Sequence, residues 1–411
     1  MIKTLQLMLA LVVATVTVAC SSNNEPPEPQ LAHRTVLVYM AASNNLGYEG
    51  RDSADIHEMQ AAARAGDLQG GHLLIYHASP NRPSSLSEID SKGNITLLKT
   101  YTDGLTSVHS QRMADVIADA RTFAPAHQLG LVLWSHGDGW LEDGITETPA
   151  GTDGSETATD GGVKRAFGVE KGRKMNITTL ANVLQDNGPI DFVYFDCCFM
   201  GSVETVYQLR HATDRIVASA IELPADGMPY DRNVRPLLNP AGADLEQAAR
   251  NTFNLYNSKT GMDRTCGMAV YDLTKADALA QATADIYRRA RRSSPAGYTP
   301  QFMQVASPFY FYDLYDYVQA IDKDNATAAD HDPSLFTRWQ AAFNDFVPYA
   351  ENTPYLWNHL SLARMHGLST YILYRNEDAN VKNYDQLDWY RDVARFIQPD
   401  KLPNALPRLA H

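Results

Sequence analysis

The chain has 411 residues, of which 44% are hydrophobic and 20% are charged, a composition that supplies a core and argues against disorder. This length accommodates two domains, or one large α/β unit with an elaboration. The formal net charge of −13 argues against non-specific nucleic-acid binding and favours cationic substrates.

The N-terminus has the pattern of a bacterial export signal over residues 1–19. Lys3 precedes an apolar run that ends at Cys20, and such signals consist of a basic start, an apolar middle and a small residue before the cut. Because Thr17-Val-Ala-Cys20 resembles a lipobox, we expect cleavage before Cys20, a lipid anchor on that residue that binds the membrane, and a polar tether over residues 20–33. The protein would then be an exported lipoprotein of the cell envelope, at the outer membrane or the cell surface. The alternative is a secretory signal that contains a cysteine.

Apolar strands and amphipathic helices alternate along the first part of the chain, which is typical of a mostly parallel sheet covered by helices on both faces. After about residue 262 the pattern becomes mixed. We therefore predict an α/β fold with a first domain over residues 34–262 and a mixed α/β C-terminal domain over residues 263–411. Strands are predicted at residues 35–40, 72–77, 95–101, 129–135, 167–170, 192–195, 215–221, 267–273 and 367–374. Helices are predicted at residues 52–63, 110–123, 177–186, 202–210, 245–259, 275–292, 336–346 and 384–396.

Two of the predicted strands end in residues that carry chemistry. Residues 129–135 run into His136-Gly-Asp-Gly-Trp140, and residues 192–195 run into Asp196-Cys-Cys198. Open α/β sheets place their ligands and reacting groups at the carboxyl ends of such strands. An imidazole and a thiol at one edge of a sheet are the two groups that a Cys–His nucleophilic site requires.

Other chemistries find little support. If Cys20 is lipidated, three cysteines remain (Cys197, Cys198 and Cys266), an odd number without the spacing of a disulfide framework. The absence of a Cys-x-x-Cys pair argues against a structural zinc site, and we predict no metal site. The chain also lacks a Gly-x-Ser-x-Gly elbow at a strand-to-helix turn and any dinucleotide or phosphate loop.

Trp134-Ser-His-Gly-Asp-Gly-Trp140 and Phe195-Asp-Cys-Cys-Phe-Met-Gly201 together resemble the clostripain family of cysteine peptidases, which belongs to the caspase–gingipain–legumain clan. The resemblance implies a caspase-like fold, with residues 34–262 as the catalytic domain, and a cysteine endopeptidase that acts on protein or peptide substrates. It spans roughly residues 35 to 398. Further matches are Tyr39-Met-Ala-Ala-Ser-Asn-Asn-Leu46, Ala218-Ser-Ala-Ile-Glu-Leu-Pro224 and Gly367-Leu-Ser-Thr-Tyr371.

The sequence departs from the family at Cys197, where alanine is usual. Position in the Asp-x-Cys motif favours Cys198 as the nucleophile. Strand alternation supports this choice, because Asp196 and Cys198 share a face and Cys197 points into the packing as an inert thiol. The resemblance implies that His136 is the partner of the thiol or the acid that protonates the leaving amine. It also implies that backbone N–H groups of Gly137 and Cys198 form the oxyanion hole.

The family cleaves after arginine or lysine, and a buried cation requires a carboxylate at the base of its pocket. Asp196 is the first candidate because it shares a face with Cys198. Asp226 is the second, and its alternative is an ordinary turn aspartate before Gly227. Asn44 and Asn45 are candidates for the mouth of the pocket, with turn chemistry as the alternative.

Family members commonly cut themselves between the histidine and the cysteine. Here residues 138–160 are rich in carboxylates and lack Lys and Arg, whereas Lys164 and Arg165 follow closely. We expect cleavage after Lys164 or Arg165 to release a cover from the pocket. Calcium binding by the acidic segment is an alternative, although its spacing matches no EF-hand pattern; no other cofactor is expected.

The rival function is a catalytically silent surface lipoprotein that binds cationic peptides, which the presence of both His136 and Cys198 argues against.

Overall fold

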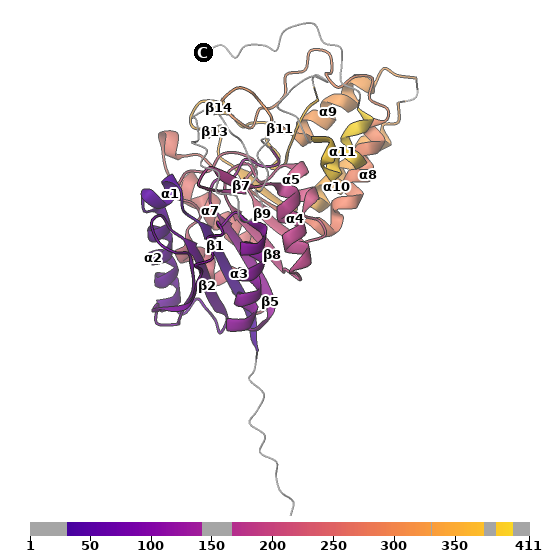
Figure 1. Ribbon diagram of the computed structural model, residues 1–411. Coiled ribbons are helices and arrows are strands. Elements are labelled where there is room, and N and C mark those ends of the chain that lie inside the picture. The colour runs from indigo at the N-terminus through magenta and orange to yellow at the C-terminus, as the bar shows by residue number, and fades with distance from the viewer. Residues whose placement is uncertain (1–30, 142–166, 330, 374–383, 398–411) are drawn as a thin grey trace, which may run out of the picture. The chain divides into compact units, whose positions relative to one another are not determined.

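The computed structural model describes residues 31–141, 167–329, 331–373 and 384–397. The described residues from Ala32 onward form one compact unit around a mixed sheet of nine strands (Figure 1). In spatial order the strands are β12 (Tyr349–Asn352), β10 (Gly267–Asp272), β9 (Arg215–Ala218), β8 (Phe192–Asp196), β5 (Ala126–Trp134), β1 (Ala32–Ala41), β2 (His72–Ala78), β3 (Ser85–Ile89) and β4 (Ile95–Thr100).

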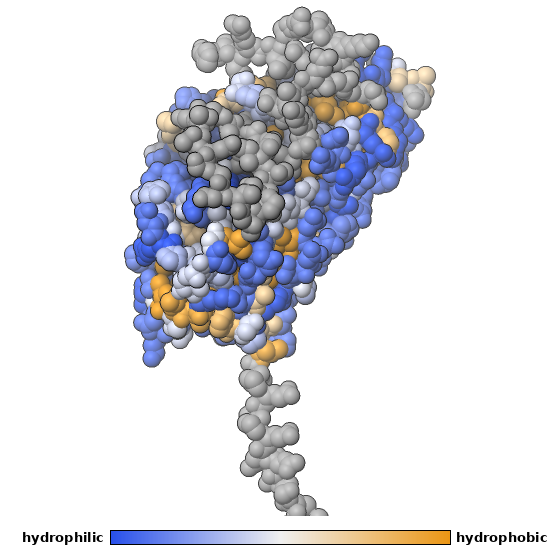
Figure 2. All heavy atoms as spheres, viewed as in Figure 1, coloured by the Kyte–Doolittle hydropathy of each residue, from blue (hydrophilic) through white to orange (hydrophobic). Residues whose placement is uncertain are grey.

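The centre of the sheet is parallel and its two margins are antiparallel. Strands β9, β8, β5, β1 and β2 pair in parallel, whereas β10 and β12 on one side and β3 and β4 on the other pair antiparallel. Continuous apolar runs form the parallel centre because both of its faces are covered. At the β4 edge, by contrast, Ile95 and Leu97 are exposed, and Figure 2 shows such hydrophobic residues gathered in small groups on a mostly hydrophilic face.

Helices cover both faces of the sheet, as the alternation along β1 shows. Val36 and Val38 belong to the hydrophobic cluster that includes residues of α2 (Arg51–Arg64), α6 (Tyr230–Leu237) and α7 (Leu245–Asn257). Leu37 and Tyr39 belong to the opposite cluster, which includes residues of α3, α4, α5 and the C-terminal helices. The predicted fold class is therefore confirmed. The helices are α1 (Asn45–Tyr48), α2 (Arg51–Arg64), α3 (Ser110–Phe123), α4 (Ile177–Asp186), α5 (Val203–Gln208), α6 (Tyr230–Leu237), α7 (Leu245–Asn257), α8 (Ala276–Tyr287), α9 (Leu314–Asn325), α10 (Ser334–Phe346) and α11 (Asp388–Asp392).

The C-terminal part of the chain differs most from the sequence-based prediction. The expected boundary after residue 262 falls inside one compact unit, because β10 and β12 continue the central sheet. The strand expected at residues 367–374 is reduced to β15 (Ser369–Thr370), which pairs with β11 (Tyr312–Asp313) instead of the main sheet. The helix expected at residues 384–396 is divided into two 3₁₀ turns and α11. Two small hairpins complete the fold: β6 (Phe167–Glu170) with β7 (Arg173–Met175), and β13 (Tyr355–Leu356) with β14 (Leu360–Ser361).

Several expected features lie outside the described residues: the export signal over residues 1–19, Cys20, most of the tether, the acidic segment beyond residue 141, and the cleavage candidates Lys164 and Arg165. In the part of the chain that the structure describes, no helix has the length and apolar character needed to cross a membrane.

Candidate active site

The histidine and the cysteine leave neighbouring strands at the same edge of the sheet. Strands β5 and β8 are adjacent and parallel, with Trp134 opposite Asp196, so the residues that follow them emerge side by side. We call residues 136–140 the His loop and residues 197–201 the Cys loop. Both loops border one pocket of about 320 Å³. Its lining residues are Leu46, Trp134, Ser135, His136, Asp196, Cys197, Cys198, Glu222, Leu223, Pro224, Ala225, Gly227 and Trp357.

The two adjacent thiols have different surroundings. Cys198 lies between the two hydrophobic clusters, and its Sγ accepts the Leu223 N–H at 3.3 Å and lies 3.7 Å from the carbonyl oxygen of the same residue. Cys197 packs with Val193 and Phe195, and its Sγ donates to the carbonyl oxygen of Leu133 at 3.0 Å. Burial raises the pKa of Cys198 to about 12 and raises the pKa of Cys197 well above its ordinary value. In this state Cys198 is a neutral thiol, and it would become a nucleophile only if a base took its proton.

His136 is held by a side chain from the first residue of α1. Its Nε2 lies 2.7 Å from Oδ1 of Asn45. Burial, followed by the charge of Lys174, lowers the pKa of His136 below its ordinary value, while Asp138 and Glu49 oppose this shift. The imidazole is therefore neutral near pH 7 and able to accept a proton. Lys174, on β7, forms an ion pair with Asp138 of the His loop.

Glycine at position 137 allows the two loops to touch. A Cβ atom there would lie 2.5 Å from the carbonyl oxygen of Cys198 and 2.8 Å from Cβ of Cys197. Contacts this short do not occur in proteins, so any side chain at Gly137 would push the loops apart. The backbone of the His loop can thus lie directly against the backbone of the Cys loop.

The Cys loop is fixed by main-chain hydrogen bonds. The N–H of Phe199 donates to the carbonyl of Ile221 at 3.1 Å, and that of Gly201 to Ser219 at 2.7 Å. On its other side, the carbonyl of Gly201 accepts from the N–H of Ser369 at 3.0 Å. Phe199 has φ of 60°, a left-handed conformation that costs a non-glycine residue free energy and persists where the surrounding structure enforces it.

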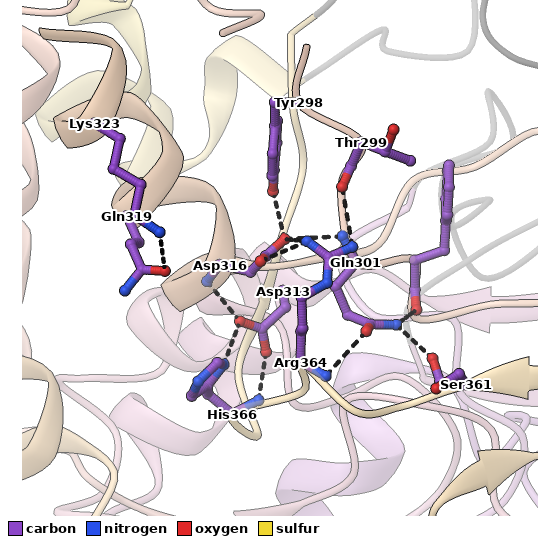
Figure 3. A network of polar contacts seen from close by, with 11 residues as sticks. Tyr298, Thr299, Gln301, Asp313, Asp316, Gln319, Lys323, Ser361, Arg364 and His366 are labelled. Atoms are coloured by element: carbon purple, nitrogen blue, oxygen red, sulfur yellow. Dashed lines mark hydrogen bonds and ion pairs between the residues drawn. The ribbon is translucent and has the colours of Figure 1, made fainter. Parts of the chain in front are cut away.

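A polar network in the C-terminal region supports the segment just before Ser369 (Figure 3). Asp313, the N-cap of α9, accepts from the backbone N–H of His366 at 2.6 Å and lies 3.0 Å from its Nδ1. Nη1 of Arg364 donates to both carboxylate oxygens of Asp316, at 2.7 and 2.9 Å. The residues beyond position 262 therefore buttress the Cys loop from behind.

Asp196 lies in the pocket below Cys198 and is 5% exposed. One carboxylate oxygen accepts the N–H of Met228 and the other the hydroxyl of Tyr230, both at 3.1 Å. Gly227 lies directly against it, since a Cβ there would be 2.8 Å from Oδ2 of Asp196. Burial raises the pKa of Asp196 to about 6, although these hydrogen bonds oppose the shift. The two hydrogen bonds favour the ionised form of this carboxyl, and burial favours the neutral form.

A second buried carboxylate lies behind the first. Asp55 of α2 is 3% exposed and accepts the indole N–H of Trp134 at 2.6 Å. Burial, reinforced by the charge of Asp196, raises the pKa of Asp55 to about 9. Sequence reasoning missed this residue. Helical spacing could have indicated that Asp55 is buried, because it shares the buried face of α2 with Met59 and Ala62.

The other three residues that the sequence suggested for substrate binding have different surroundings. Asp226 is half-exposed and pairs with Arg51 and with Lys259, the latter at 3.3 Å. Asn44 is buried and follows turn chemistry: it caps α1 and donates to the carbonyls of residues 41 and 169. Its neighbour Asn45 contacts His136 instead. None of these three is a lining residue of the pocket.

The sequence analysis also did not identify Trp357, an aromatic residue in the wall of the pocket. Trp357 lies at the tip of the β13–β14 hairpin, where it and Asn358 have φ of 50° and 56°. Its indole N–H donates to the carboxylate of Glu222, and its backbone N–H donates to Oγ1 of Thr265 at 2.8 Å. The strained backbone and the two hydrogen bonds fix the indole against the pocket.

No cluster of three or more His, Cys, Asp or Glu residues is placed to hold a metal ion within the described ranges. The acidic segment considered for calcium lies outside them.

A mostly parallel sheet covered on both faces, with a histidine and a cysteine at neighbouring strand ends, defines a cysteine peptidase with a caspase-like fold. The model of the clostripain family matches residues 38–394, and the chain belongs to that family. It is thus a cysteine peptidase, which confirms the resemblance seen in the sequence. No curated protein matches the chain.

Solved structures of related enzymes agree. A secreted C11 cysteine protease from Bacteroides thetaiotaomicron, bound to an irreversible peptide inhibitor, is 27% identical, with a TM-score of 0.72 over 88% of this chain and 99% of its own. An inactive zymogen C11 protease from Parabacteroides distasonis is 25% identical, with a TM-score of 0.72 over 89% and 99%. A further secreted C11 protease from B. thetaiotaomicron, at 21% identity and a TM-score of 0.73 over 89% and 100%, shares the fold.

Proposed function

We propose that this cysteine peptidase is an endopeptidase that cleaves after arginine or lysine. The observation that carries the proposal is the buried carboxylate of Asp196, which opens into the same pocket as Cys198. An arginine or lysine side chain in this pocket would exchange its water shell for a charge-assisted contact with Asp196. Trp357 and Trp134 would flank its aliphatic stem. Asp226 lies further out and, through Arg51 and Lys259, tunes the charge at the rim.

The reaction proceeds through an acyl-enzyme. The sulfur of Cys198 attacks the scissile carbonyl as its proton passes to His136, and the backbone N–H groups of Gly137 and Cys198 stabilise the oxyanion. His136 then gives the proton to the leaving amine, and water releases the acyl group. The close approach of Gly137 to the carbonyl of Cys198 supports these roles, since it places the main chains of the two oxyanion-hole residues side by side.

A panel of fluorogenic peptides ending in Arg, Lys, Asp or Ala tests the specificity, with the chain from residue 21 onward as enzyme. We expect cleavage after Arg and Lys alone. In Asp196→Asn, kcat/KM for these substrates should fall on the order of 10²-fold, because an unpaired buried cation costs about 3 kcal/mol. Alkylation of Cys198 by iodoacetamide should continue in that variant. Equal cleavage after Asp or Ala would contradict the proposal. No cleavage of any peptide, even after trypsin nicking near Arg165, would favour the silent peptide-binding lipoprotein.

We further propose that the enzyme activates itself by cleavage after Lys164 or Arg165. The relative described as an inactive zymogen supports a latent form. Directly after these residues, Phe167 is fully buried and the N–H of Gly168 donates to the carbonyl of His136 at 2.9 Å. The new N-terminus would therefore stay anchored beside the His loop after the cut. N-terminal sequencing of the smaller fragment tests this, and a fragment that starts elsewhere would refute the assignment.

We also propose that Cys20 carries a lipid anchor, so that the enzyme acts from the cell envelope. The description of a relative as secreted supports export, and the lipobox-like sequence supports lipidation. In Cys20→Ser the protein should leave the membrane fraction, and mass spectrometry should find no diacylglyceryl group on its N-terminus.

A further inference from the structure

We propose that Asn45 is a positioning residue of the reaction, which fixes the tautomer and rotation of His136. The proposal depends on the cysteine peptidase activity and not on the preference for arginine or lysine. Its basis is the 2.7 Å contact between Oδ1 of Asn45 and Nε2 of His136. The contact joins residues 91 positions apart in the chain.

The contact determines which ring nitrogen reacts. A carbonyl oxygen only accepts, so Oδ1 of Asn45 requires the proton of neutral His136 to be on Nε2. Nδ1 then carries the free lone pair and is the nitrogen that can take the proton of Cys198. The opposite orientation of the amide would place a donor against Nε2 and a proton on Nδ1, which leaves His136 unable to act as a base toward the thiol.

The same hydrogen bond persists through the reaction. When Cys198 attacks, its proton moves to Nδ1 and His136 becomes an imidazolium that donates from both nitrogens. Nε2–H still donates to Asn45, and Nδ1–H is presented to the leaving amine. Because the bond to a charged donor is stronger than the bond to a neutral one, Asn45 also favours the imidazolium that forms during acylation.

Asn45 is not a lining residue of the pocket, and the helix that carries it is anchored by Asn44. Asn45 is the first residue of α1, and Asn44 caps this helix by accepting the N–H of Leu46 at 3.0 Å. Asn44 is in turn bonded to the carbonyl of Ala41 at the end of β1, at 2.8 Å, and lies 3.3 Å from Oγ of Ser135. Asn44 thus anchors the start of α1, and Asn45, the next residue, contacts the imidazole of His136.

The charged groups that act on His136 come from several elements. Lys174 belongs to β7, Asp138 to the His loop itself, and Glu49 to the end of α1. Asn45 carries no charge, so it orients the ring without adding to this balance. An aspartate in its place would keep an acceptor near Nε2 but would add a negative charge.

The test compares Asn45→Ala and Asn45→Asp with Tyr48→Ala, a control on the exposed surface of the same helix. With the best substrate of the peptide panel, Asn45→Ala should lower kcat per titrated active site about 10- to 100-fold and change KM less than about threefold. Asn45→Asp should recover much of this loss and move the acid limb of the kcat/KM profile to higher pH, because the carboxylate stabilises the imidazolium. Tyr48→Ala should match the parent enzyme.

Alkylation of Cys198 by iodoacetamide gives a second measurement that does not depend on peptide specificity. Its rate near pH 7 should fall in Asn45→Ala in parallel with kcat, whatever the preferred substrate residue. A purely structural role would lower the fraction of titratable sites and leave kcat per site and the pH profile unchanged. An effect on KM alone would instead assign Asn45 to substrate binding. Either result would overturn the proposal.

Discussion

The Cys loop and the His loop leave neighbouring strands at one edge of the sheet, but different kinds of contact hold them. The Cys loop is fixed mainly by main-chain hydrogen bonds from residues 219–221 and from Ser369. The main chain of the His loop is bonded to Gly168, which donates to the carbonyl of His136, and two side chains also bind this loop. These are Asn45 on His136 and Lys174 on Asp138. Changes around the Cys loop should therefore alter geometry and stability, whereas changes around the His loop should alter protonation.

The two adjacent cysteines give the largest expected effect. Cys198→Ala removes the proposed nucleophile and should lower kcat/KM on the order of 10⁴-fold or more. Cys197→Ala deletes a buried thiol from the core and should cost about 1 kcal/mol of stability, with kcat within about threefold of the parent. Kinetics with the peptide panel and thermal unfolding measure both quantities. If activity were lost in the Cys197 variant and kept in the Cys198 variant, the nucleophile would have to be reassigned.

The scaffold of the Cys loop should also respond to pH. Glu204 of α5, directly behind this loop, is fully buried and accepts the N–H of Tyr371 at 2.8 Å and the hydroxyl of Thr370 at 3.0 Å. Burial raises the pKa of Glu204 to about 7, against 4.5 for the unperturbed group. Between these values the folded state binds more protons than the unfolded state, so stability falls as the pH rises through this window.

Glu204→Gln should remove that dependence. From pH 4 to pH 8 the free energy of unfolding of the parent should fall by about 3 kcal/mol relative to the variant. Denaturant unfolding at both pH values measures the difference, and the parent serves as the internal reference for all other titrating groups. Parallel pH dependence of the two proteins would mean that Glu204 stays ionised when buried.

The sequence predicted the parts of this comparison that follow from local pattern. The strands before His136 and Cys198 are continuous apolar runs, and parallel strands with intervening helices bring their carboxyl ends to one edge. The choice of Cys198 over Cys197 rests on position in the Asp-x-Cys motif, with support from the two-residue period of a strand, and it stays a prediction. In the structure Cys197 belongs to the same hydrophobic cluster as Val193 and Phe195. Helices such as α3 and α4 have the predicted bounds because apolar residues recur at helical spacing.

Contacts between distant segments could not be predicted in this way. The bond between Asn45 and His136, the burial of Asp55 behind Asp196, and the placement of Trp357 each join segments far apart in the chain. The segment at residues 367–374 is apolar enough for a strand, yet only Ser369 and Thr370 form one. Their backbone is already engaged by β11 and by Gly201, so the run cannot join the main sheet.

The smallest expected effect concerns the His loop, where two substitutions should move one pKa in opposite directions. Lys174 lowers the pKa of His136 and Asp138 raises it. Lys174→Met removes the cation and keeps the negative charge of Asp138, so the pKa of His136 should rise. Asp138→Asn removes the anion and leaves Lys174 unpaired, so the same pKa should fall.

The acid limb of the kcat/KM profile reports this pKa in the free enzyme, because His136 must be neutral to accept the proton of Cys198. It should move to higher pH in Lys174→Met and to lower pH in Asp138→Asn, by less than about one unit in each case, because partly exposed charges are screened by solvent. The fraction of titratable sites should stay unchanged, because the Cys loop does not depend on this ion pair. Shifts in the same direction in both variants would show that the pair acts by holding the loop in place and not through its charges.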